Sequence, residues 1–206
     1  MYQYYFKPCL DFLLALFAIS CALPLIIVVF LIGVCKQENY FFSQTRIGLR
    51  GRAFKIFKFR TMVPNADLVL EKLLCDRPDL RAEWEKYRKL TKDPRVTQLG
   101  HFLRKFKLDE ILQLINVLKG EMSLIGPRPL MEDEVERYFS PGNKAQYFSV
   151  KPGITGAWAC QGRASASMAY KKRIEVEVQY TTKVTLVGDI RISLITVKEI
   201  FNGNGA

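Results

Sequence analysis

The first forty residues are dominated by one uninterrupted apolar run. From Phe12 to Val34 the chain reads FLLALFAISCALPLIIVVFLIGV, without a single charged side chain. A helix that crosses a bilayer needs about 20 such residues, whereas the buried helix of a soluble protein is rarely apolar on every face. The run is too long for the core of a signal peptide, and no small-residue cleavage site follows it. The pattern therefore predicts a membrane-embedded helix.

Pro24 lies near the centre of this run. Proline removes a backbone donor and clashes with the preceding turn, so a kink is predicted there. A kink is compatible with a spanning helix and with a re-entrant helix that turns back within the bilayer. The flanking charges are balanced, with Lys7 and Asp11 before the run and Lys36 and Glu38 after it, so the positive-inside rule does not decide. The residues alone leave both topologies open.

Residues 41–60, FFSQTRIGLRGRAFKIFKFR, contain two strand-like runs around Gly48 and Gly51, which predicts a β-hairpin. Apolar residues at helical spacing follow over most of the remaining chain. Helical patterns are predicted over 67–75, 80–87, 100–119 with a break near Leu108, 132–138, 167–180 and 185–201. The last of these has a large apolar face and is expected on the membrane surface. The fold class is therefore mainly α with a small β-hairpin.

Charge narrows the choice of partners. Lys and Arg number 31 against 20 Asp and Glu, a net charge of +11, which favours nucleic acid, anionic lipid headgroups or phosphorylated small molecules. Five cysteines in no CxxC pair and a single histidine, His101, argue against a structural zinc site and fit a reducing compartment. His101 is expected to pack or to cap a helix.

Six of the basic residues fall in the predicted hairpin, which has no acid: Arg46, Arg50, Arg52, Lys55, Lys58 and Arg60. One interpretation is a solvated hairpin on anionic headgroups, where each such residue contributes about 1 kcal/mol. The other is a grip on a diphosphate. We assign Lys58 and Arg60 to the diphosphate and most of the others to headgroups.

Asp109 and Glu110 are adjacent in KLDEILQLINVLKGEMSLIGPRPL. An acid in the first turn of a helix can simply cap it, for about 0.3–1 kcal/mol. Two neighbouring carboxylates also repel unless a cation is near, and Mg²⁺ takes one or two carboxylates plus substrate phosphates. Pro127 and Pro129 hold Arg128 in a stiff turn, where its guanidinium can grip phosphate. A carboxylate pair, a rigid arginine and a membrane helix suit phosphoryl transfer at a bilayer.

Ordered blocks along almost the whole chain resemble the bacterial sugar transferases, or monotopic phosphoglycosyl transferases. These blocks are the apolar segment with its central proline, FSQTRIGLRGRAFKIFKFRTM, LDEILQLINVLKGEMSLIGPRPL, KPGITGAWACQGR and the region of Asp189. The resemblance implies transfer of a sugar-1-phosphate from a UDP-sugar to a polyprenyl phosphate such as undecaprenyl phosphate, with release of UMP. It also implies that Asp109 attacks the sugar-linked phosphate and forms a covalent phosphosugar intermediate.

The resemblance also assigns roles to other residues. Glu110, with Asp109, would bind Mg²⁺ and would help to deprotonate the acceptor, and Arg128 would hold phosphate. Arg163 and Asp189 would lie near the nucleotide, although a loop charge and a partner for a nearby Lys or Arg are the alternatives. Trp158 is expected to pack or to anchor at the interface rather than to act in catalysis.

A topology follows from the same resemblance. The helix, residues 1–36, would enter the bilayer, break at Pro24 and return to the cytoplasmic side, leaving 37–206 as a cytoplasmic α/β catalytic domain with surface amphipathic helices on the bacterial inner membrane. Two features depart from the pattern: Leu23 stands where many members have Ser before the proline, with Ser20 one turn earlier as a substitute, and Cys160 and Gln161 replace the usual residues of their loop.

The chain lacks the additional N-terminal helices of larger members, so we expect a minimal catalytic unit. Self-association on the bilayer is compatible with the sequence, although no heptad repeat supports it. A competing hypothesis is a non-enzymatic membrane-anchored module that binds nucleic acid or anionic lipid through its basic residues. No aromatic–basic stacking platform or nucleic-acid motif supports that module, so nucleic acid is not an expected partner.

Overall fold

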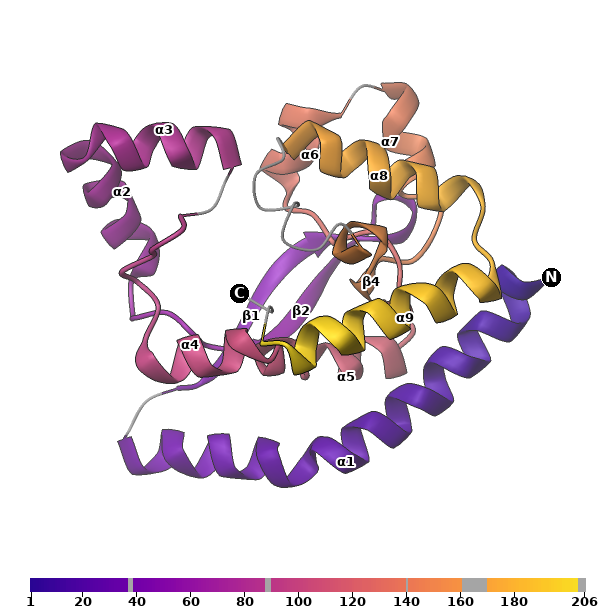
Figure 1. Cartoon of the computed structure of the whole chain (residues 1–206), viewed down its shortest axis with the longest axis horizontal. Helices are drawn as coiled ribbons and strands as arrows, with labels where there is room; N and C mark the ends of the chain where they lie inside the picture. Colours follow the sequence, from indigo (N-terminus) through magenta and orange to yellow (C-terminus); the bar gives the residue numbers. More distant parts are fainter. Residues whose placement is uncertain (37–38, 88–89, 140, 161–169, 204–206) are drawn as a thin grey trace.

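The computed structural model describes residues 1–36, 39–87, 90–139, 141–160 and 170–203. These form a mainly helical fold with a two-stranded antiparallel sheet and a short parallel strand pair (Figure 1). A short π-helical turn, η1 (Tyr2–Phe6), leads into the long apolar helix α1 (Lys7–Lys36). The hairpin follows as β1 (Phe41–Ile47) and β2 (Ala53–Phe59), joined by the single turn η2 (Leu49–Gly51). The predicted hairpin is confirmed.

The helices beyond the hairpin largely match the periodic pattern. Their bounds are α2 (Ala66–Asp76), α3 (Pro78–Tyr87), α4 (Gln98–Lys105), η3 (Leu108–Glu110, a 3₁₀ turn), α5 (Gln113–Leu118), α6 (Glu132–Tyr138), α7 (Pro141–Tyr147), α8 (Tyr170–Thr182) and α9 (Leu186–Phe201). The break predicted near Leu108 is confirmed. The start predicted for the following helix is wrong, because Asp109 lies in the 3₁₀ turn and α5 begins only at Gln113.

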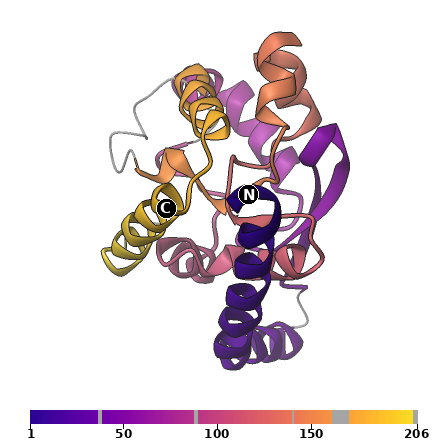
Figure 2. The same cartoon turned by 90° about the vertical axis from the view of Figure 1, so that its right-hand side faces the viewer.

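Helix α1 bends along its length: its first arm slopes down from the N-terminus, and its second arm runs nearly level along the bottom of the molecule (Figures 1 and 2). Pro24 lies inside it, and Ser20 one turn earlier donates its hydroxyl to the carbonyl of Leu16 at 2.9 Å. Most of the helix is apolar and uncovered: over its most hydrophobic window only 17% of the residues are buried. Large side chains such as Phe17 (70% exposed) and Leu31 (52%) face outwards. By length and composition this is a candidate membrane helix.

The covered face of α1 is narrow, and its buried hydrophobic side chains lie seven residues apart, at Ala15, Ala22 and Val29. Ala15 packs in a cluster with Ile56 of β2 and Leu114 of α5. The second arm of α1 contributes Val29 to a neighbouring cluster with Tyr40, Phe59, Leu103 and Leu112. Small side chains on the first arm let the helix approach α5 closely, and Ile111 packs against both clusters. The apolar helix thus forms the floor beneath β2, η3 and α5.

A buried polar cluster fastens the beginning of α1. Lys7 donates to Asp189 of α9 at 2.7 Å and lies 3.9 Å from Asp11, so the predicted pairing of Lys7 with Asp11 is confirmed as the longer of two contacts. Asp11 in turn accepts from the hydroxyl of Ser123 at 2.7 Å. Asp189 also accepts from Tyr2 and Tyr180. These bonds join α1, α8, α9 and the segment after α5 at one point.

Two short strands that the sequence pattern did not reveal, β3 (Ser123–Ile125) and β4 (Gly153–Thr155), pair in parallel. Gly126 follows β3, and any side chain there would collide with the backbone of Lys151. Side chains at Gly153 and Gly156 would likewise collide with the backbone of Gly126. The glycines of the IGPRP and KPGITG segments therefore serve close backbone packing, which fixes the turn that carries Arg128.

Candidate active site

The dyad faces away from the apolar floor because of local spacing. Leu108, Ile111 and Leu112 pack against the cluster that contains Val29, and positions i, i+3 and i+4 share one face of a helical turn. Asp109 and Glu110 lie between them and take the other side. The turn begins at Lys107, whose backbone is left-handed (φ 54°), a conformation that costs a non-glycine residue of order 1 kcal/mol or more.

Glu110 is held by one cation. The Nζ of Lys58 lies 2.7 Å from Oε1 of Glu110, and the two side chains are 20% and 25% exposed. Burial alone would raise the pKa of Glu110, but the charge and hydrogen bond of Lys58, together with the charges of Arg128 and Lys107, lower that pKa to about 2. Glu110 is therefore ionised at neutral pH.

Asp109 is in the opposite situation. Burial and then repulsion by Glu110 raise the pKa of Asp109, and the positive charges of Lys58 and Arg104 oppose that rise only in part. Two adjacent carboxylates thus have pKa values shifted in opposite directions, an arrangement typical of sites that divide roles between two acids. Asp109 has the more basic oxygen, while Glu110 is the fixed negative charge.

Arg128 reaches the site from the turn after β3. Its positive charge lowers the pKa of Glu110, and its backbone carbonyl accepts from the hydroxyl of Tyr147 at 2.8 Å. Burial alone would lower the pKa of Arg128, but Glu134, Tyr170 and Glu110 raise it. Its Nε is buried without a hydrogen-bond partner among the described residues. A donor left unpaired costs free energy and is available to an anionic ligand.

Three further residues were predicted at the site: Arg60, Arg163 and Asp189. Arg60 is half-buried, and among the described residues no ion pair joins it to the dyad; its backbone donates to Tyr40. Arg163 lies outside the described residues. Asp189 is 3% exposed and accepts from Lys7, Tyr2 and Tyr180. These contacts favour the alternative noted from the sequence, a partner for a nearby lysine, and the nucleotide role of Asp189 stays a prediction.

Arg46 is an exception among the basic residues of the hairpin that were expected at headgroups, because it is 6% exposed and pairs with Glu134 at 3.1 Å. Arg50, Arg52 and Lys55 are exposed, and their contact with headgroups stays a prediction. Burial and the nearby Arg128 lower the pKa of Arg46 to about 10, although Glu134 opposes them. His101 does not pack, because it is exposed on α4. Trp158 packs as expected, with the guanidinium of Arg173 5.7 Å from the centre of its ring.

Sequence reasoning missed Arg104 as a site residue. It lies in the last turn of α4, donates from Nε to Thr61 at 2.9 Å and lowers the pKa of Asp109. The only signal in the sequence was the basic run RKFK directly before the dyad.

The donor set is compatible with Mg²⁺. No group of three or more His, Cys, Asp and Glu side chains that could hold a metal occurs among the described residues. The dyad supplies two carboxylates, which is the number Mg²⁺ commonly takes from a protein when substrate phosphates complete its shell. Because Lys58 occupies one oxygen of Glu110, a metal there would share or replace that contact.

Comparison with known proteins gives a consistent answer. The family model described as bacterial sugar transferase matches residues 2–203. The UDP-galactose-lipid carrier transferase of Erwinia amylovora is 41% identical over 202 residues, 98% of this chain and 42% of that protein. The undecaprenyl-phosphate galactose phosphotransferase of Salmonella typhimurium is 40% identical over 202 residues, again 98% of this chain and 42% of that protein.

A relative of more similar length is the exopolysaccharide production protein ExoY of Sinorhizobium fredii, 38% identical over 201 residues, 97% of this chain and 87% of that protein. The chain thus spans less than half the length of the two longer relatives and most of the shorter one.

The ion pair predicts how Lys58→Met alters stability. The pKa of Glu110 is about 2 in the folded protein against an ordinary 4.5, so the pair stabilises the fold fully above pH 4.5 and loses this effect as pH falls towards 2. Lys58→Met should lower the free energy of unfolding by about 2–3 kcal/mol at neutral pH. The loss should shrink at about pH 3 because Glu110 can then protonate. Denaturant unfolding in detergent at both pH values measures this.

The double variant Lys58→Met/Glu110→Gln is the control, since it removes the unpaired charge and should recover most of the lost stability. An equal loss at both pH values, or no recovery in the double variant, would contradict the assigned pairing.

Proposed function

This chain belongs to the bacterial sugar transferase family, and on that premise we propose that it transfers a sugar-1-phosphate from a UDP-sugar to a polyprenyl phosphate and releases UMP. Two relatives are named for transfer of galactose or its phosphate to a lipid carrier. The observation that carries the proposal is the pair of adjacent carboxylates with oppositely shifted pKa values beside Lys58 and Arg128. In such a site a carboxylate can attack a phosphate while the two cations stabilise the negative charge of that phosphate.

In the first step we propose that a carboxylate oxygen of Asp109 attacks the sugar-linked phosphorus of the donor. An oxygen–phosphorus bond forms to Asp109, the bond from that phosphorus to the bridging oxygen breaks, and UMP leaves. The raised pKa of Asp109 supports this choice of nucleophile, because a more basic carboxylate oxygen is a better nucleophile. Arg128 and Lys58 would stabilise the negative charge of the diphosphate during this step.

In the second step an oxygen of the polyprenyl phosphate attacks the same phosphorus. The bond to Asp109 breaks, and the carboxylate is regenerated with the sugar diphosphate now on the lipid. With a pKa of about 2, Glu110 is a weak base, so we assign it to holding charge rather than to deprotonating the acceptor. Mg²⁺, held by Glu110 with Asp109, would neutralise phosphate charge when bound.

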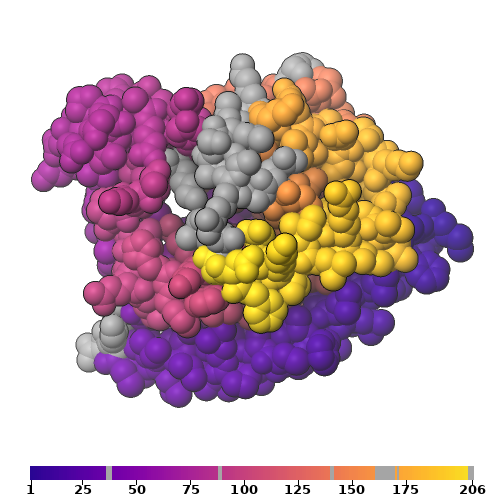
Figure 3. All heavy atoms as spheres, in the orientation of Figure 1, coloured from indigo at the N-terminus to yellow at the C-terminus, as the bar shows by residue number. Residues whose placement is uncertain are grey.

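We also propose that α1 is re-entrant and the protein monotopic, with 1–36 as the membrane helix and 37–206 as a catalytic domain on the cytoplasmic side of the bacterial inner membrane. The bend of α1 supports this (Figures 1 and 2). The exposed apolar stripe of α9, which runs through Val187, Ile190, Leu194 and Phe201, would rest on the same surface. Figure 3 shows α9 beside α4 and α1.

Replacement of the nucleophile tests the reaction. Asp109→Asn should reduce UMP release from a UDP-sugar in the presence of polyprenyl phosphate and Mg²⁺ by at least about a thousandfold, because an amide oxygen cannot form the intermediate. A panel of UDP-sugars assayed by coupled UMP detection measures this and identifies the donor. Arg191→Gln, a change of an exposed cation on α9, serves as the control. Substantial turnover by Asp109→Asn would eliminate the nucleophile assignment.

Three native cysteines test the topology of α1, because Cys9, Cys21 and Cys35 are exposed along it. In single-cysteine variants, a membrane-impermeant maleimide should label Cys9 and Cys35 in inside-out vesicles only, and it should not label Cys21 from either side. Labelling of Cys9 and Cys35 from opposite sides of the bilayer would show a spanning helix instead.

A further inference from the structure

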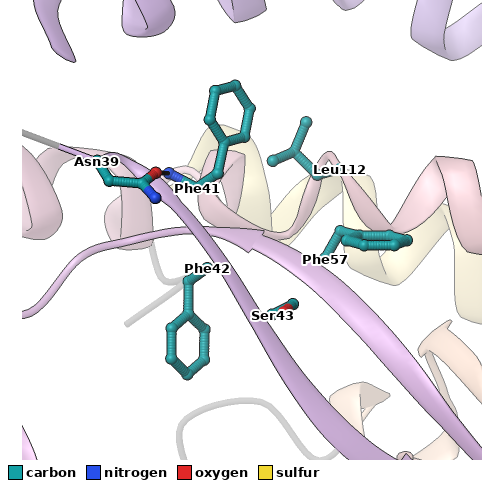
Figure 4. A pocket seen from close by; sticks show the side chains of 6 residues that line it. All are labelled: Asn39, Phe41, Phe42, Ser43, Phe57 and Leu112. Carbon is teal, nitrogen blue, oxygen red and sulfur yellow. Dashed lines mark hydrogen bonds between the residues drawn. The ribbon is translucent and has the colours of Figure 1, made fainter.

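The first strand of the hairpin carries exposed aromatic rings on both of its faces. Phe41 is 41% exposed and Phe42 is 39% exposed. Beside them lies a hollow of about 270 Å³ lined by Asn39, Phe41, Phe42, Ser43, Phe57 and Leu112 (Figure 4). Exposed aromatic rings around a hollow are unusual on a purely aqueous surface, where large apolar patches commonly mark binding sites. Neither the ion pairs nor the dyad chemistry explains them.

Strand register places this aromatic end next to the catalytic cation. Phe42 is the direct antiparallel partner of Lys58, and Phe41 is the partner of Phe59. Residues opposite each other project to the same face of a sheet, so Phe42 shares a face with Lys58 while Phe41 shares the face that packs towards α1. In Figure 4 the two rings point to opposite sides of the strand. The start of β1 therefore lies between the face of the hairpin that packs towards α1 and the face that carries Lys58.

The apolar side continues to the helix that we place in the membrane. The ring of Phe41 lies 6.1 Å from that of Phe30 in the second arm of α1, and 5.9 Å from Phe59. Phe30 is itself 49% exposed. An uncovered aromatic path therefore runs from the lipid-facing surface of α1 across β1 to the strand pair that holds Lys58.

A side-chain hydrogen bond fixes the backbone at the start of β1. The side-chain oxygen of Asn39 accepts from the backbone N–H of Phe41 at 2.9 Å, which fixes the direction in which the chain enters β1. Leu112 closes the other side of the hollow and is 3% exposed. It lies two residues after Glu110, so the hollow and the dyad turn are parts of one segment.

We propose that this hollow binds the first isoprenoid units of the acceptor lipid, with its phosphate end directed towards Lys58 and the dyad. The proposal rests on the proposed function and assigns a site to one of its two substrates. The required ligand is an apolar chain with one anionic end, which matches an apolar hollow at the start of β1 and a cation, Lys58, on the other face of the same hairpin. A free phosphate would use the cation but not the hollow, and the UDP-sugar has no apolar chain to place there.

Filling the hollow tests the proposal. Ser43 is exposed and lines it, so Ser43→Trp should obstruct the chain while leaving the fold intact. We expect the KM for polyprenyl phosphate to rise by about tenfold, equivalent to about 1.4 kcal/mol, with kcat and the KM for the UDP-sugar unchanged. Thr45→Trp is the matched control, since Thr45 is exposed two residues along the same strand face and does not line the hollow. An unchanged acceptor KM in Ser43→Trp would overturn the proposal.

A second measurement separates this proposal from the proposed function. A polyprenyl phosphate with a diazirine in its first isoprenoid units should crosslink to residues 39–43 of the wild-type chain, and Ser43→Trp should abolish that adduct. Absence of turnover with every UDP-sugar would remove the proposed reaction, yet the crosslink would still report on the hollow. Crosslinks confined to other segments, or unaffected by Ser43→Trp, would overturn the hollow as the lipid site even in an active enzyme.

Discussion

The ion pair between Lys58 and Glu110 allows a carboxylate to stay ionised beside the apolar side chains of α1. The two side chains meet at 2.7 Å and are mostly buried, and an unpaired carboxylate in that position would be costly. Fixing Glu110 as an anion also separates it from its neighbour, because its charge contributes to the raised pKa of Asp109. One ion pair thus gives two adjacent acids different chemistry, and β2 and η3 are arranged so that it can form.

Hydrophobic packing joins helix α1 to the segments that carry the dyad and Lys58. Val29 and Leu112 share a cluster with Phe59, so the residues on either side of the dyad and of Lys58 rest on α1. At the other end of α1, Lys7 and Asp189 pair at 2.7 Å in a buried position. An apolar helix that is fastened by buried ions at its start and by a hydrophobic cluster in its second arm has a fixed orientation relative to the catalytic turn. The proposed transfer from a soluble donor to a lipid acceptor would require such a fixed orientation.

Local patterns in the sequence were sufficient for much of the fold. Gly48 and Gly51 between two strand-like runs predicted the hairpin, and the periodic patterns over 67–75 and 80–87 predicted two separate helices, the second of which begins at Pro78. The parallel pair β3–β4 was missed because three-residue strands are too short to show a period. The pairing of Arg46 with Glu134, 88 positions apart, was missed for a different reason: no local pattern encodes a contact between distant segments. Resemblance supplied the roles at the dyad, while the opposite pKa shifts needed the neighbours that only folding brings together.

The central claim is that Asp109 bears a covalent phosphosugar during turnover. Its most direct test is incubation of the protein with a UDP-sugar labelled in the sugar-linked phosphate, without acceptor, followed by rapid quenching and peptide mass spectrometry. The account predicts one labelled peptide with the added sugar phosphate on Asp109, formed together with UMP and discharged when polyprenyl phosphate is added. Product formation without any adduct on Asp109, or an adduct that polyprenyl phosphate does not discharge, would contradict it.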